Sequence, residues 1–194
     1  MPLADGQHLE LLLEAIAVEG RAQSALLAGD NAGARESFLE ASRLYRESWE
    51  QASPTAFGRL IGMLKAAVIA GDARAAAAYA RTQLPDPPES APSNYALAIA
   101  ALIEGDDETA RAASAGMRGG SPPFVRTADA IDGLLDGDDA RYADALGEIV
   151  ADFEGREEHL TGVRIADTAI MLERLAAARG MACEPTSSLL PAGH

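Results

Sequence analysis

A Gly-Asp pair recurs four times along this chain of 194 residues, and each pair stands between two apolar helical segments. Glycine readily takes the left-handed backbone conformation that ends a helix, and aspartate accepts the free N–H groups that begin the next one. The pairs therefore predict the turns of four helical hairpins. They lie at Gly29-Asp30, Gly71-Asp72, Gly105-Asp106 and Gly137-Asp138.

The composition favours an all-α fold. Alanine, the strongest helix former, occurs 42 times, and hydrophobic residues make up 48% of the chain, enough for a packed core. We expect one domain over residues 1–194. A linker-like break is expected at 85–92, where four prolines fall, and an irregular tail is expected at 181–194.

The spacing of the turns indicates a repeat. The four glycines lie 42, 34 and 32 residues apart, near the 34-residue period of tetratricopeptide repeats. After the first glycine come a small residue, an aromatic and a second small residue, Ala34, Phe38 and Ala41. Pro88 and Pro122 each follow their glycine by 17 residues, whereas the fourth unit has Tyr142 where a small residue belongs. The chain thus resembles the tetratricopeptide family over about residues 8–155. This resemblance implies a tetratricopeptide-like stack of about four antiparallel hairpins plus a C-terminal helix.

Three helix boundaries are expected from local signals. Ser53-Pro54, a cap followed by the proline favoured at the first helical position, predicts the start of the third helix. The proline-rich run 84–92 is expected to be non-helical. Thr161 is expected to cap a last helix over Gly162–Arg179, after which Leu189-Leu190 should fold back onto the last helices.

The resemblance also implies where a ligand would bind. In tetratricopeptide arrays the first helix of each hairpin lines a concave groove that holds proteins or peptides. This implies contacts from the third, fifth and seventh helices. The partner-binding candidates are Arg59, Asn94, Tyr95, Arg126 and Asp129. The alternative is that these side chains pack the ends of the array.

The net charge of the chain indicates which class of partner it could bind. The net charge is −14, and no basic patch of the kind that nucleic-acid binders carry is visible. Asp129, Asp132 and Asp136 are spaced to share one helix face. Such a face would attract a basic protein or peptide, although it could also serve only to keep the protein soluble.

A second resemblance concerns the last third of the chain. An acidic turn at 136–139 precedes a helix, Glu157-Glu158-His159 follows, and the final helix ends at Arg179-Gly180 before the segment 187–191. This order is similar to the ends of helical immunity proteins from bacterial polymorphic-toxin systems. It implies a protein that neutralises a toxin.

Catalytic and metal-binding chemistry is not indicated. The three histidines lack zinc-ligand spacing, and His159 is expected at an exposed helix end, with a metal ligand or base as the alternative. The single Cys183 allows no internal disulfide, which favours a reducing, cytoplasmic location and a small, partly buried thiol. The apolar stretch Leu9–Val18 is interrupted by two glutamates, so we expect neither a signal sequence nor a membrane span.

Together these features predict a non-enzymatic scaffold without cofactors that binds a protein or peptide. One alternative is the immunity protein. Another is a helical domain that binds, or acts on, a small molecule in an apolar pocket with convergent polar groups. A homodimer is a further expectation, because a short alanine-rich array can dimerise to cover its end faces.

Overall fold

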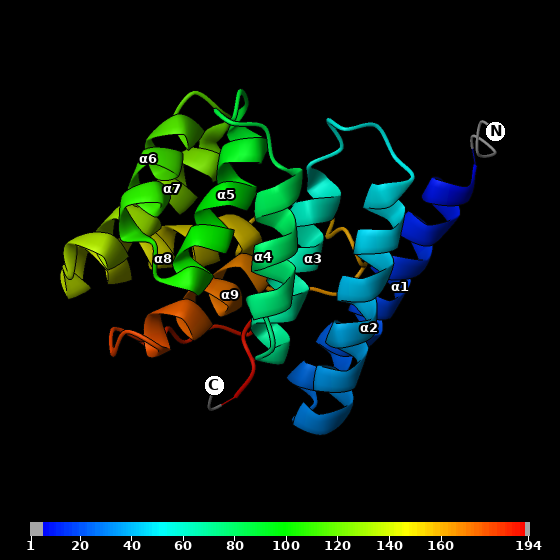
Figure 1. Ribbon diagram of the computed structural model, residues 1–194. Coiled ribbons are helices and arrows are strands. Elements are labelled where there is room, and N and C mark those ends of the chain that lie inside the picture. The colour runs from blue at the N-terminus through cyan, green and yellow to red at the C-terminus, as the bar shows by residue number, and fades with distance from the viewer. Residues whose placement is uncertain (1–5, 193–194) are drawn as a thin grey trace.

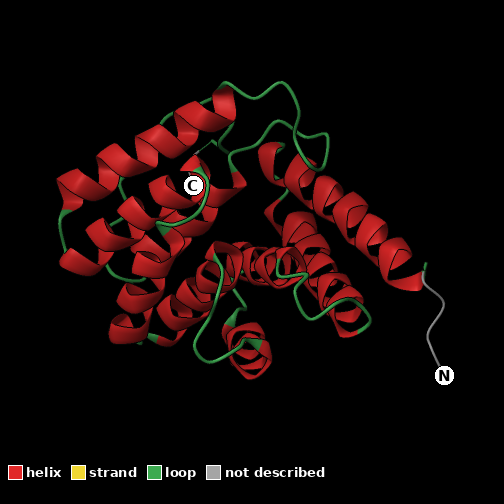
Figure 2. Ribbon diagram, turned by 90° about the horizontal axis from the view of Figure 1, so that it is seen from above, coloured by secondary structure: helices red, strands yellow, loops and turns green. Residues whose placement is uncertain are grey.

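The computed structural model describes residues 6–192, which form nine α-helices and no strand (Figures 1 and 2). The all-α prediction is therefore confirmed for this range. Residues 193 and 194 of the predicted tail, and with them His194, lie outside it. The helices are α1 (Gln7–Leu27), α2 (Asn31–Glu50), α3 (Gly58–Ala70), α4 (Arg74–Gln83), α5 (Ala91–Glu104), α6 (Asp107–Met117), α7 (Pro122–Asp136), α8 (Asp139–Glu154) and α9 (Asp167–Ala177).

Each of the four Gly-Asp pairs lies in the turn between two consecutive helices. The glycines have φ between +65° and +81°, a conformation that costs other residues strain; they are Gly29, Gly71, Gly105 and Gly137. Three of the aspartates accept a hydrogen bond from a backbone N–H of the following helix, namely Asp30, Asp106 and Asp138. The remaining aspartate, Asp72, differs. α4 begins two residues after Asp72, and the N-cap of this helix is Ala73, which has no side-chain bond.

This difference predicts unequal effects of two matched substitutions. Asp138→Ala should lower the free energy of unfolding by about 1 kcal/mol, because a capping bond of 3.0 Å to Arg141 N is lost. Asp72→Ala should change it by less than about 0.5 kcal/mol. Urea unfolding of both variants checks this, and equal losses would contradict the assignment of the caps.

The helices pack as consecutive neighbours, and the last one turns back. α1 pairs with α2, α5 with α6 and α7 with α8, while α3 contacts α5 and α5 contacts α7. α9 does not extend the row but packs against α3, α7 and α8 (Figure 1). Buried apolar side chains from all nine helices form one connected core.

Two expected helix starts were wrong. α3 begins at Gly58 and not at Ser53, whose hydroxyl instead lies 3.0 Å from that of Thr55 in a turn. α9 begins at Asp167, five residues later than expected. Thr161 donates a hydrogen bond to Gln23 of α1, and Gly162 is left-handed at φ +75°. The expected cap of α3 thus forms a local turn, whereas the expected cap of α9 bonds a distant helix.

The linker is shorter than expected, and the tail behaves as expected. Pro92 lies in the first turn of α5, which Ser90 caps through Ser93 N, so the non-helical run is 84–90. Leu189 and Leu190 are buried, and Leu189 O accepts a bond of 3.0 Å from Ala166 N, which confirms that they fold back. No helix within residues 6–192 has the length and hydrophobicity that crossing a bilayer requires.

Candidate functional site

Two of the sequence-predicted candidates are buried between the helices. Asn94 and Tyr95 of α5 are each 7% exposed. Asn94 donates to Ser90 O at 2.9 Å, while the Tyr95 ring meets Phe124 edge-on at 5.9 Å. The hydroxyl of Tyr95 is buried beside Thr168 of α9, and burial raises its pKa. Tyr95 therefore packs α5 against α7, whereas the bond of Asn94 stays within the first turn of α5.

The predicted acidic face of α7 is paired with arginines. Arg118 lies 2.9 Å from a carboxylate oxygen of Asp129, and Arg118 and Arg141 both pair with Asp132. Asp136 pairs with Arg111 and Arg141. Arg126 forms an ion pair with Asp152 of α8. The aspartates do share a helix face, but arginines from α6 and α8 compensate their charge and join these helices to α7.

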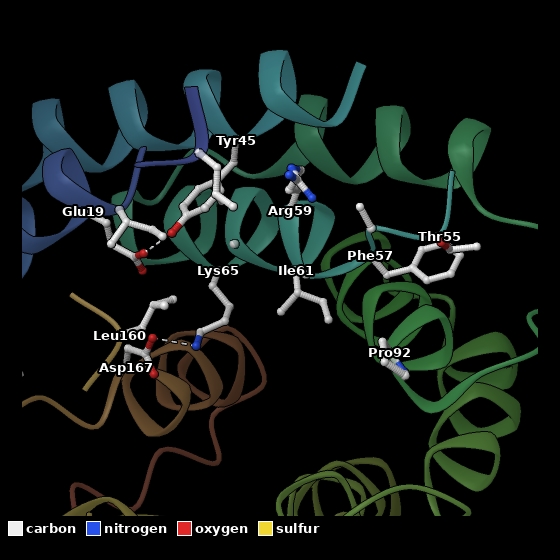
Figure 3. A pocket seen from close by; sticks show the side chains of 15 residues that line it. Glu19, Tyr45, Thr55, Phe57, Arg59, Ile61, Lys65, Pro92, Leu160 and Asp167 are labelled. Carbon is white, nitrogen blue, oxygen red and sulfur yellow. Dashed lines mark hydrogen bonds and ion pairs between the residues drawn. The ribbon is translucent and has the colours of Figure 1, made fainter. Parts of the chain in front are cut away.

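Arg59, the remaining candidate, lies beside a groove between α1 and α3 (Figure 3). Its guanidinium donates to Ser48 Oγ at 2.8 Å and lies 3.0 Å from His8 Nδ1. The groove is a cavity of about 370 Å³. Its larger apolar lining residues are Leu12, Ile16, Phe57, Ile61 and Leu160.

One exposed leucine lines this groove, and two more lie on the helix that forms one of its walls. Within residues 6–192, the exposed large apolar side chains are Leu9, Leu13 and Leu160, at 49%, 66% and 76%. Leu9 and Leu13 continue the groove-lining stripe of Leu12 and Ile16 along α1, because residues three and four apart share a helix face. An apolar surface that a protein leaves in water marks a binding site more often than isolated leucines do.

The inner end of the groove carries buried polar groups (Figure 3). Tyr45 Oη of α2 donates to Glu19 Oε2 of α1 at 2.6 Å. Lys65 Nζ of α3 lies 2.6 Å from Asp167 Oδ2 of α9. Gly62 makes room for this arrangement, since a Cβ there would lie 2.9 Å from the Tyr45 ring. Four helices thus bring together two carboxylates, one phenol and one ammonium group.

Glu19 is 3% exposed, and its pKa is raised to about 7. Burial is the main cause, and the negative charge of Asp167 adds to it. Lys65 and the hydrogen bond from Tyr45 act in the opposite direction. Near neutral pH this carboxyl group therefore changes its charge.

Glu19→Gln should consequently remove a pH dependence of stability. The pKa in the folded state, about 7, lies above the ordinary value of 4.5, so the folded protein binds more protons between these values. The stabilisation by neutral Glu19 is complete below pH 4.5 and is lost as the pH rises through 7. Between pH 5.5 and 7 the wild type should lose about 1.5 kcal/mol relative to the variant in urea unfolding. A variant with the pH profile of the wild type would show that Glu19 is already ionised at pH 5.5.

A second hollow, of about 190 Å³, adjoins the groove and shares Glu19, Lys65, Leu160 and Asp167 with it. His159 lines this hollow. The expectation of an exposed histidine was wrong, because its ring lies 6.2 Å from that of Phe153 and its Nε2 is buried without a hydrogen bond. Residues of the segment 155–166 thus lie beside the polar groups.

Cys183 lies apart from the groove, in the tail. It is partly buried, as expected. Burial and the nearby Glu173 carboxylate raise the pKa of its thiol to about 12. Because the thiolate is the reactive form, this environment works against a nucleophilic role.

Sequence reasoning missed most of the groove. The stripe of Leu9, Leu12, Leu13 and Ile16 was the one local signal for it. Comparison with known proteins adds no relative: no protein-family model, no curated protein and no solved structure matches this chain.

Proposed function

We propose that this chain is a tetratricopeptide-like array that acts as a non-enzymatic binding protein, and that it holds an apolar segment of a partner protein in the groove between α1 and α3. The left-handed glycines at the four turns support the array, as do the contacts of α3 with α5 and of α5 with α7. The family implies a ligand on the third, fifth and seventh helices. In this chain α9 packs against α3 and α7, so we place the ligand in the groove between α1 and α3.

The coincidence of cavity and exposed leucines carries this proposal. A cavity with apolar walls opens beside Leu160, and the leucines of α1 extend the same surface outward. An amphipathic segment recognised by an apolar groove presents its anchors in this way. The net charge of −14 favours a basic partner, since long-range attraction speeds its association.

The test is a capture experiment from the native lysate with three forms of the protein. Leu13→Glu combined with Leu160→Glu places charges on the rim of the groove at exposed positions, where the folding cost is small. Ala112→Glu on the exposed face of α6 is the matched control. A partner that binds the wild type and the control but not the double variant supports the proposal. A partner retained by all three forms, or none at all, would overturn it.

A small molecule is the second candidate occupant. The cavity volume lies within the range of about 300–1,000 Å³ typical of small-ligand sites, and polar groups converge at one end of it. Mass spectrometry of metabolites that co-purify with the wild type but not with the double variant distinguishes this candidate from a protein partner. A basic toxin held one-to-one in the capture experiment would favour the immunity protein.

A further inference from the structure

The groove ends at a carboxylate that has no cation of its own. Glu19 accepts hydrogen bonds from Tyr45 Oη at 2.6 Å and from Gln23 Nε2 at 3.4 Å, and both donors are neutral. The nearby ammonium of Lys65 is bound to Asp167 Oδ2 at 2.6 Å and donates also to Thr168 at 3.2 Å. The group of Glu19, Lys65 and Asp167 therefore carries one negative charge in excess when Glu19 is ionised.

This excess charge is stabilised poorly in the unliganded protein. A buried carboxylate needs a cation or several hydrogen bonds to stay ionised, and without them it takes up a proton. The raised pKa of Glu19 agrees with this description. A cation from outside would restore the balance of charge, and Glu19 lines the groove through which that cation would enter.

The apolar walls of the groove suit the aliphatic part of a side chain that carries such a cation. Leu12 and Ile16 of α1 and Ile61 of α3 provide aliphatic surface in the groove that Glu19 also lines. Lysine and arginine side chains bury their methylene stems against apolar surface while the charged end finds a polar partner. An anionic group would instead meet two carboxylates.

We propose that the groove takes a basic side chain of the partner segment, with its aliphatic stem between α1 and α3 and its cationic end on the Glu19 carboxylate. This rests on the proposed function and specifies its ligand: an apolar segment that contains a lysine or arginine. Glu19 is then the residue that determines specificity, and Leu12, Ile16 and Ile61 supply contact area.

The test compares three probes that share one alkyl chain: octylammonium, octanol and octanoate. Binding is measured by calorimetry at pH 8 with the full chain. Octylammonium should bind at least tenfold more tightly than octanol, and octanoate should bind most weakly. Glu19→Gln should remove the preference for the amine while it leaves the affinity for octanol within twofold. Glu148→Gln, which removes an exposed carboxylate of α8, should behave as the wild type.

The pH dependence provides a second readout on the wild type. Lowering the pH to 5.5 protonates Glu19 and should abolish the preference for octylammonium. The ionisable groups that face Glu19 are Tyr45, Lys65 and Asp167, with Arg156 and His159 in the adjoining hollow. The measurement is repeated with Glu19→Gln, in which the two pH values should give equal ratios.

Each outcome decides the inference. Equal affinity for amine and alcohol, or a preference that persists in Glu19→Gln, overturns it. Absence of binding of all three probes overturns it as well. If amine and alcohol bind equally well, the Leu13→Glu, Leu160→Glu variant shows whether octanol binds in the groove. Loss of octanol binding in that variant would keep the groove as a binding site, so the proposed function would survive the failure of the ligand assignment.

Discussion

Replacing Glu173 with leucine is expected to destabilise the protein by about 4 kcal/mol, because three donors lose their acceptor at once and one of them is the buried hydroxyl of Tyr142. Glu173 of α9 is 5% exposed. Its carboxylate accepts from Tyr142 Oη of α8 at 2.9 Å, from Cys183 N at 3.1 Å and from Glu184 N at 2.8 Å. Leucine fills a similar volume but leaves a phenol and two backbone N–H groups without partners.

Urea unfolding followed by circular dichroism measures this loss, and hydrogen exchange locates it. The amides of Cys183 and Glu184 should lose their protection first, because Glu173 is the acceptor that fixes this part of the tail. Glu148→Leu on the exposed surface of α8 is the control and should change stability by less than about 0.5 kcal/mol. A protected tail in Glu173→Leu would show that other contacts hold it.

The same contact explains a departure of the sequence from its repeat. Tyr142 occupies a position where the tetratricopeptide pattern has a small residue. In the structure Tyr142 is fully buried, and its hydroxyl reaches Glu173 on α9. The large side chain thus connects α8 to α9, the helix that packs back against α3 and α7. The sequence signals the exception but contains no indication of its partner 31 residues later.

The features that could be predicted from the sequence are those that neighbouring residues determine. The four Gly-Asp turns fix where helices end because glycine and aspartate act on adjacent backbone groups. The start of α9 was wrong for the opposite reason. Thr161 has the chemistry of a helix cap, but its hydroxyl bonds Gln23, 138 residues earlier in the chain. No property of residues 161–166 alone distinguishes these two uses.

The candidate site could not be predicted either, because its residues lie far apart in the sequence. Glu19, Tyr45, Lys65 and Asp167 come from four helices, and no two of them are close in the sequence. The aspartates of α7 show the converse error. Their spacing correctly places them on one face, but Arg118 and Arg141, which neutralise them, belong to neighbouring segments. The pattern within one helix predicts which residues share a face, but it does not show whether residues of other segments neutralise their charge.

Two glycine-to-alanine substitutions should act in opposite directions. Gly133→Ala is expected to lower the free energy of unfolding by about 3 kcal/mol, because a Cβ on α7 would meet backbone atoms of α8. It would lie 2.8 Å from Tyr142 N and 3.0 Å from Tyr142 Cα. Backbone atoms cannot rotate away as a side chain can, so α7 and α8 would have to separate. Gly147→Ala on α8 meets nothing within 4 Å and should stabilise by about 0.5–1 kcal/mol.

The pair separates helix propensity from contact, since both glycines are helical and both variants gain the same methyl group. Thermal and urea unfolding of the two variants gives the difference directly. If propensity dominated, both would be more stable than the wild type, and α7 would not need close approach to α8. A loss confined to Gly133→Ala would instead show that the fourth hairpin depends on direct backbone contact at this crossing. That close contact is what positions Tyr142 within reach of Glu173, so Gly133→Ala should also weaken the protection of the tail amides at Cys183 and Glu184.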